Sequence, residues 1–249
     1  MKSVLTITGL CKSFGGIQAI KSVNLSINKG ERHLLIGPNG AGKTTLFNLI
    51  AGDLYPDSGK IFLNQKDVTR LSNYKRAKLS VSRTYQIITL FGKDNLVHNV
   101  KLALLAKSWD KWKCWDQFSS KKNLTESALK ISNKVGLEHK AFLPLEETSY
   151  GEKRRLEIAM ALAQDPEILL LDEPLAGLSI EERESIQSLL SNIDKKITIL
   201  MIEHDMEVAL SFADCITLLH HGEVIVSGTK DEVINDPRTE EIYLGERVN

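Results

Sequence analysis

Residues 37–45 have the sequence Gly37-Pro38-Asn39-Gly40-Ala41-Gly42-Lys43-Thr44-Thr45, which contains the spacing G-x-x-x-x-G-K-[ST]. The glycines let the backbone turn tightly and approach an anion without a clash from Cβ atoms. The backbone N–H groups of such a loop, and the helix N-terminus that follows it, present partial positive charge to phosphates. The stretch therefore predicts a nucleotide-binding loop to which all nine residues contribute.

The segments on both sides of this loop support the prediction. Residues 32–36, Arg-His-Leu-Leu-Ile, are typical of a short buried strand, and residues 45–50 have the apolar spacing of a helix face. In a strand–loop–helix of this kind, Lys43 reaches the β- and γ-phosphates of a nucleoside triphosphate, and the Thr44 hydroxyl ligates Mg²⁺. We therefore expect a nucleoside triphosphate and Mg²⁺ as ligands.

The composition limits the classes of protein to consider. The chain has 249 residues, enough for one large or two modest domains, and 42% of them are hydrophobic. Its 32 Lys and Arg residues balance 32 Asp and Glu residues, so no global basic field indicates a nucleic-acid partner. The three cysteines contain no C-x-x-C pair, which favours free thiols in a reducing compartment. Neither a signal peptide nor an apolar run long enough for a membrane span is visible.

The N-terminal part of the chain predicts an antiparallel β layer. Residues 4–8 alternate apolar and polar, Gly15-Gly16 interrupt the strand, and residues 17–27 continue with strand-like spacing. Phe14 lies directly before the glycine turn. Its ring either stacks on a nucleotide base or packs in the core, and by residue type alone the core is favoured.

A helical block then interrupts an alternation of strands and helices. Residues 95–107 and 127–135 have helical apolar spacing, and residues 108–123 between them hold all three tryptophans, together with several lysines. These aromatic side chains either cap the core of a subdomain, which is the simpler interpretation, or contact a membrane partner or lipid headgroups.

The sequence thus predicts an α/β fold with a P-loop NTPase core, an N-terminal antiparallel β layer and an inserted α-helical subdomain. We expect a single domain over residues 1–249. Within it, residues 1–86 and 164–249 are expected to form the nucleotide-binding core, and residues 87–163 the helical subdomain.

Residues 148–152, Thr-Ser-Tyr-Gly-Glu, begin another predicted helix. Ser149 suits the N-cap, and Glu152 three residues later completes a capping box. One interpretation is a well-capped helix and nothing more. The other is a second anion site, built from the Ser149 hydroxyl, the backbone at Gly151 and the helix N-terminus.

Two adjacent carboxylates, Asp172 and Glu173, follow the fully apolar residues 168–171. Such a run is typical of a central parallel strand, and charge at its end is costly unless it is used. Asp172 suits Mg²⁺ coordination. By strand alternation Glu173 points the other way, which suits the polarisation of a water molecule.

Gln86 and His204 also follow predicted strands, residues 81–85 and 198–202. An amide oxygen at such a position can hold a water or a metal ion, and a histidine can donate to a phosphate oxygen. Taken alone, each of the two residues is better explained as a solvated loop residue.

In their order along the chain, these motifs resemble the ATP-binding subunit of ABC transporters, and the resemblance covers the whole chain. It implies that residues 37–45 are the Walker A loop and residues 148–152 the signature motif. It also implies roles for five single residues. Phe14 would stack on the base, and Gln86 would contact Mg²⁺, the attacking water and the permease. Asp172 would be the Walker B aspartate that coordinates Mg²⁺, Glu173 the catalytic glutamate and His204 the switch histidine.

The resemblance further implies two subunits clamped head to tail. Each ATP then lies between the Walker A loop of one subunit and Ser149 and Gly151 of the other. The expected catalytic residues are Glu173, His204, Gln86 and Lys43, and the expected Mg²⁺ ligands are Thr44, Gln86 and Asp172.

Several longer strings are similar to the branched-chain amino acid uptake branch of this family, with urea uptake and lipopolysaccharide export ATPases as near relatives. They are Ser82-Arg83-Thr84-Tyr85-Gln86, Arg154-Arg155-Leu156-Glu157-Ile158-Ala159, Ala176-Gly177-Leu178, Glu203-His204-Asp205-Met206 and Tyr243-Leu244-Gly245-Glu246. The chain departs from the family pattern at Thr148, usually Leu, at Glu152, usually Gln, and at Ser179, usually Asp.

We therefore expect an Mg²⁺-dependent ATPase that drives import of branched-chain amino acids or a similar small polar metabolite. The expected partners are transmembrane permease subunits, a second ATP-binding subunit, a periplasmic or extracellular substrate-binding protein, and no nucleic acid. The expected location is peripheral, on the cytoplasmic face of the inner (plasma) membrane. The alternatives are a lipopolysaccharide-type exporter ATPase, a soluble ABC ATPase without a transport role and a non-hydrolysing regulator; Glu173 and His204 argue against the last.

Overall fold

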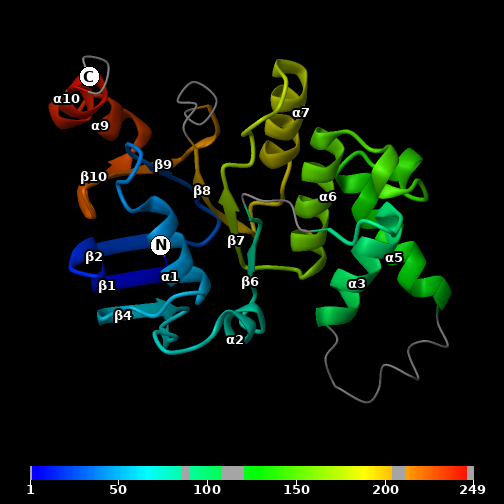
Figure 1. The fold of residues 1–249 in the computed structure, drawn as a ribbon, viewed down its shortest axis with the longest axis horizontal. Helices are drawn as coiled ribbons and strands as arrows, with labels where there is room; N and C mark the ends of the chain where they lie inside the picture. The colour runs from blue at the N-terminus through cyan, green and yellow to red at the C-terminus, as the bar shows by residue number, and fades with distance from the viewer. Residues whose placement is uncertain (1, 86–89, 108–120, 204–210, 246–249) are drawn as a thin grey trace. The chain divides into compact units, whose positions relative to one another are not determined.

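The computed structural model describes residues 2–85, 90–107, 121–203 and 211–245 (Figure 1). Contacts divide the chain into two compact units. The core unit comprises residues 1–81, 167–173 and 194–249, and the helical unit comprises residues 82–166 and 174–193. The helical unit thus includes all of residues 87–163, the segment expected as a subdomain, together with residues 82–86, 164–166 and 174–193.

The core unit holds an antiparallel sheet of four strands. In sheet order these are β2 (Ile17–Asn28), β1 (Ser3–Phe14), β4 (Ser58–Leu63) and β5 (Lys66–Asp67). Gly15 and Gly16 join β1 to β2 with φ angles of 51° and 90°, which glycine adopts at little cost. The predicted N-terminal β layer is confirmed.

A second, mixed sheet has six strands. In sheet order these are β10 (Glu223–Thr229), β9 (Cys215–His220), β3 (Arg32–Ile36), β8 (Thr198–Ile202), β7 (Ile168–Asp172) and β6 (Val81–Arg83). Strands β9, β3, β8 and β7 run parallel, and β10 closes an antiparallel hairpin with β9. Every residue of β3, β7 and β8 is buried, as expected for parallel strands covered on both faces.

Helix α1 (Lys43–Ala51) follows the glycine-rich loop and contacts both β2 of the first sheet and β7 of the second (Figure 1). Its buried face belongs to a hydrophobic core shared with both sheets. The helix ends at Gly52, whose φ of 84° is left-handed and whose N–H donates to the carbonyl of Asn48. The predicted strand–loop–helix is therefore confirmed.

The described residues of the core unit also form α2 (Asn73–Ala77), α9 (Lys230–Ile234) and α10 (Pro237–Gly245). Pro237 is the first residue of α10. Proline suits that position because its missing N–H has no partner within a helix there.

The described part of the helical unit contains four longer helices. They are α3 (Leu96–Lys107), α5 (Lys121–Lys134), α6 (Tyr150–Ala163) and α7 (Ile180–Ser191), with two 3₁₀ turns, η2 (Glu138–Lys140) and η3 (Leu145–Glu147). Helix α3 packs on α5 and α6, and α6 also contacts α7. Trp109, Trp112 and Trp115 lie outside the described residues. Of the helices described, none is both long and apolar enough to cross a membrane.

Arg76, in α2, is a buried charge that joins the end of α1 to the following segment. Its Nη1 donates to the carbonyls of Leu49, at 2.5 Å, and Ile50, at 2.7 Å, in the last turn of α1. Its Nε and Nη2 donate to the carbonyls of Leu71 and Thr69. Burial lowers the pKa of Arg76 to about 10, so the guanidinium stays protonated at neutral pH and partners carbonyls that the helix leaves open.

We expect Arg76→Met to destabilise the protein by at least about 3 kcal/mol, because four buried carbonyls lose their donor at once. Urea unfolding followed by circular dichroism would measure this loss. Lys75→Met removes a neighbouring exposed charge and serves as the control. Equal unfolding midpoints for the two variants would contradict the role assigned to Arg76.

Candidate nucleotide site

The glycine-rich loop of the core unit is shaped by close backbone contacts. Gly37 has a φ of 145°, and a Cβ there would lie 2.0 Å from the carbonyl oxygen of Leu219. Gly42 has a φ of 102°, and a Cβ there would lie 2.6 Å from the carbonyl oxygen of Ala19. Both positions therefore require glycine, because the loop packs directly against neighbouring main chain.

Lys43 is the first residue of α1, and its side chain folds back over the loop. It is only 6% exposed, and its Nζ donates to the carbonyls of Gly37, at 2.5 Å, and Pro38, at 2.8 Å. The ammonium group is thus held at the beginning of the loop. Phosphate oxygens are stronger acceptors than carbonyls, because the hydrogen bond is then between two charged groups.

The β register places Asp172 near this loop, at the carboxyl edge of the sheet. Leu35 of β3 is paired with Ile202 of β8, which in turn is paired with Asp172 of β7. Because adjacent strands are spaced about 4.8 Å apart, Asp172 lies two strands, or about 10 Å, from the strand that leads into the loop. Ligands of parallel α/β sheets bind at this edge.

Glu173 departs from the simple prediction. Strand β7 ends at Asp172, and Glu173 has a left-handed φ of 47° while its N–H donates to the carbonyl of Ile202 at 3.0 Å. Strand alternation therefore does not fix the direction of its side chain, because alternation holds only while the strand continues. A non-glycine residue in this conformation costs free energy, and such residues cluster at functional sites.

The donor set suits Mg²⁺ bound together with phosphates. Asp172 supplies a carboxylate that is 2% exposed, and Thr44 supplies an exposed hydroxyl at the start of α1. The described residues contain no group of three or more His, Cys, Asp or Glu side chains arranged to hold a metal. Mg²⁺ commonly takes one or two carboxylates and completes its shell with phosphate oxygens and water, so it fits this site.

Phe14 is the last residue of β1 and is 45% exposed. The interpretation that it packs in the core, which residue type favoured, is therefore wrong. The Nζ of Lys12 lies 5.4 Å from its ring centroid. Base stacking by Phe14 stays a prediction, and so do the roles of Gln86 and His204, which lie outside the described residues.

The start of α6, in the helical unit, has the predicted capping box. Ser149 Oγ accepts from the N–H of Glu152 at 3.2 Å, and Glu152 Oε2 accepts from the N–H of Ser149 at 2.9 Å. Glu152 Oε1 also lies 2.6 Å from Lys140 Nζ, so the charge of Glu152 is paired. Thr148 is buried and donates its hydroxyl to the carbonyl of Leu145. Glu152 and Thr148, two residues that depart from the family pattern, thus have structural roles.

A residue that sequence reasoning missed contacts the same helix start. Glu182, in the first turn of α7, accepts from Ser149 Oγ and from the N–H of Gly151 through one oxygen, Oε1, at 3.2 Å each. The S-x-x-E pattern of residues 179–182 could have revealed a capping box. It could not have revealed this contact, which joins residues 31 and 33 positions apart.

Arg154, also missed, ties α6 to two chain segments of the helical unit. Its side chain is 1% exposed and donates to the carbonyls of Tyr85, at 2.8 Å, and Pro174, at 3.1 Å. It also forms a buried ion pair with Glu157 at 2.7 Å. In the sequence, Tyr85 directly precedes Gln86 and Pro174 directly follows Glu173, so Arg154 fixes residues next to both predicted catalytic positions.

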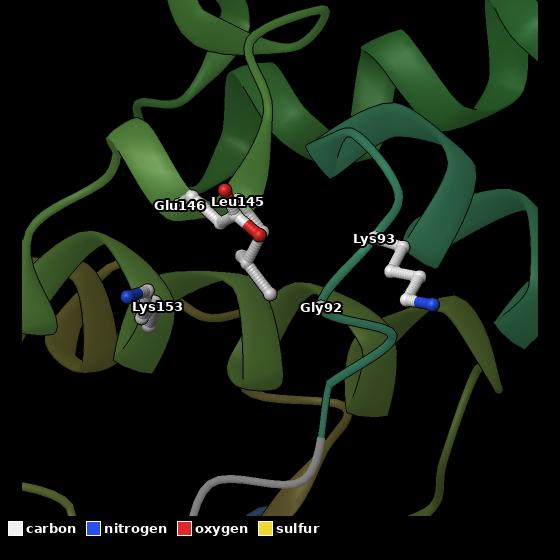
Figure 2. Close-up of a pocket in the computed structure, with 5 residues that line it drawn as sticks. All are labelled: Gly92, Lys93, Leu145, Glu146 and Lys153. Carbon is white, nitrogen blue, oxygen red and sulfur yellow. The ribbon is translucent and has the colours of Figure 1, made fainter.

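The helical unit also has a pocket of about 310 Å³, lined by Gly92, Lys93, Leu145, Glu146 and Lys153. Figure 2 shows that Lys153 comes from α6, Leu145 and Glu146 from the turn before it, and Gly92 and Lys93 from the segment that precedes α3. The lining combines one apolar side chain with both signs of charge.

Comparison with known proteins agrees with this geometry. A family model described as ABC transporter matches residues 20–176. The chain is 34% identical over 252 residues to the high-affinity branched-chain amino acid transport ATP-binding protein LivG of Salmonella typhimurium strain LT2, covering 98% of each chain. It is 36% identical over 249 residues to the spermidine/putrescine import ATP-binding protein PotA of Fusobacterium nucleatum, covering 98% of this chain and 63% of PotA.

A solved structure supports both the fold and the nucleotide. The dimeric structure of a post-hydrolysis state of the ATP-binding cassette MJ0796, bound to ADP and Pi, matches with a TM-score of 0.78 and 28% identity. The match covers 91% of this chain and 98% of that one. This chain thus has the glycine-rich loop, the carboxylate of Asp172 at the end of β7 and the capped helix α6 on the same fold as that cassette. This chain therefore belongs to the ABC transporter family as an ATP-binding subunit, and it is an ATPase that uses ATP and Mg²⁺.

Proposed function

We propose that this chain drives the import of branched-chain amino acids or a similar small polar metabolite. The observation that supports this cargo is the similarity to LivG, which extends over nearly the full length of both chains. The match to PotA makes polyamines the competing cargo, although it leaves over a third of PotA uncovered. Fold and motifs are shared by transporters of many cargos, so the cargo needs its own experiment.

The roles of the core-unit residues follow from their positions. Lys43 moves from the carbonyls of Gly37 and Pro38 to the β- and γ-phosphates of ATP, and the glycine-rich loop encloses those phosphates with N–H groups. Thr44 and Asp172 would hold Mg²⁺, which would neutralise charge on the phosphates. Glu173 orients the attacking water and accepts its proton.

A second subunit completes each site in this proposal. Its Ser149 hydroxyl and Gly151 N–H, at the capped N-terminus of α6, donate to the γ-phosphate held by the first subunit. Gln86 and His204 are proposed to complete the site near the attacking water and the γ-phosphate. Hydrolysis then removes the γ-phosphate, which holds the two subunits together.

The permease is proposed to bind the helical unit at the pocket beside α6. Two lysines and one glutamate surround Leu145 there, which suits a short amphipathic segment of the permease with an acidic residue. In the sequence, Lys93 follows Gln86, the predicted sensor of the permease, by seven positions. This partner places the chain peripherally, on the cytoplasmic face of the membrane.

Co-purification with the native membrane subunits, followed by reconstitution in liposomes, tests the cargo. We expect ATPase activity to rise when a binding protein loaded with leucine, isoleucine or valine is present, and a Glu173→Gln complex to serve as the inactive control. If spermidine stimulated the ATPase activity instead, the cargo would be a polyamine. If lipopolysaccharide alone stimulated it, the proposal of an importer would give way to that of an exporter.

We also predict that Phe14→Ala weakens ATP binding by roughly threefold to tenfold with little loss of melting temperature, because an exposed ring contributes to stacking and not to the core. Fluorescent-nucleotide titration and thermal unfolding would measure the two quantities. Ile17→Ala, at the neighbouring exposed position across the turn, is the control. Unchanged ATP affinity combined with a lower melting temperature would contradict the prediction.

A further inference from the structure

The carboxylate of Glu182 occupies the predicted γ-phosphate position at the start of α6. Its Oε1 accepts from Ser149 Oγ and Gly151 N–H, the two donors that the proposed function assigns to the γ-phosphate. A Cβ on Gly151 would lie 2.5 Å from this oxygen, so the carboxylate touches the backbone itself. A phosphate oxygen and Glu182 Oε1 therefore cannot both bind there.

The contact is built into the start of α7. Glu182 Oε2 accepts from the N–H of Ser179, and Ser179 Oγ accepts from the N–H of Glu182. One carboxylate oxygen thus caps α7 while the other covers the start of α6. These hydrogen bonds, led by that from Ser179, hold the pKa of Glu182 below its usual range, so the group is negatively charged at neutral pH.

The departure at Ser179 fits this arrangement. An aspartate, the usual family residue, would place a second negative charge at the N-cap, beside the carboxylate of Glu182. The neutral serine supplies the same capping oxygen without that repulsion. Ser179 therefore permits Glu182 to keep its position.

We propose that Glu182 is an internal anion that fills the signature site of the free subunit and must leave before this site accepts the γ-phosphate of ATP held by a second subunit. The inference rests on the proposed role of Ser149 and Gly151. It implies that the free subunit resists premature closure, because each of the two symmetric sites must exchange one anion for another. Removal of the charge should therefore ease ATP-driven dimerisation.

The experiment uses the full chain with Glu173→Gln, so that ATP is bound and not consumed. Sedimentation across an ATP titration gives the concentration at which half of the protein is dimeric. We expect Glu182→Gln to lower this concentration roughly fivefold or more, since two sites lose a repulsive charge. Glutamine at this position still completes a capping box, so the melting temperature should not change.

Glu181→Gln is the matched control, because it removes the same charge from the neighbouring exposed residue. The inference would be overturned if both variants shifted the ATP concentration for half-dimerisation equally, or if Glu182→Gln did not shift it. Ser149→Ala tests the underlying function separately. If Ser149→Ala weakens dimerisation while Glu182→Gln has no effect, the inference fails and the proposed function stands. If Ser149→Ala has no effect, both fail.

Discussion

A Lys43→Ala variant is expected to lose ATP hydrolysis by roughly a hundredfold to a thousandfold. The ammonium group of Lys43 is held by two carbonyls of the loop that is proposed to bind the β- and γ-phosphates. Alanine removes the only side-chain cation that the proposed mechanism assigns to the charge that develops on the phosphates. Release of inorganic phosphate from the purified protein measures the effect.

The control for this variant is Lys66→Ala, which removes an exposed lysine of β5 in the same unit. Thermal unfolding separates lost chemistry from lost structure, because a folded but inactive Lys43→Ala protein keeps its cooperative transition. Hydrolysis near the normal rate in a folded Lys43→Ala protein would be incompatible with the role assigned to the loop.

Glu173→Gln is expected to slow hydrolysis by roughly a hundredfold or more while ATP still binds. Glutamine has the shape of glutamate but cannot accept the proton of the attacking water. The substitution also keeps a side chain that fits the left-handed backbone at this position as well as glutamate does. The lost activity is then a loss of chemistry and not of conformation.

The same variant is expected to accumulate as a dimer in ATP with Mg²⁺, because closure persists until the γ-phosphate is cleaved. Size-exclusion chromatography with and without nucleotide measures this. Glu184→Gln, an exposed position on α7, is the control and should stay monomeric after ATP is consumed. A Glu173→Gln protein that remains monomeric in saturating ATP would show that another residue has this role.

Local patterns predicted much of this protein correctly. Residues 32–50 form the expected strand, loop and helix because each part depends on neighbours in the sequence: apolar runs, glycine freedom and helical spacing. The capping box at Ser149 and Glu152 also spans only three positions. The set of motifs was enough to indicate the family, which the comparisons confirm.

Other features depend on contacts between distant parts of the chain. The core position that residue type alone favoured for Phe14 was wrong, whereas its expected base stacking stays a prediction. Strand alternation, from which the direction of the Glu173 side chain was expected, does not extend to that residue. The strand ends one residue earlier than alternation requires, and the hairpin leaves Phe14 at its exposed tip. Neither outcome is encoded in the residues next to these positions.

The sequence by itself thus determined the phosphate loop, the antiparallel layer and the capped helix, because short-range geometry and hydrophobic periodicity specify them. Only the tertiary structure decided that Arg154 bonds to the carbonyls of Tyr85 and Pro174, and that Glu182 covers the donors at Ser149 and Gly151. Side-chain hydrogen bonds of this kind carry no periodic signal, since their partners are brought together only when separate helices and loops pack.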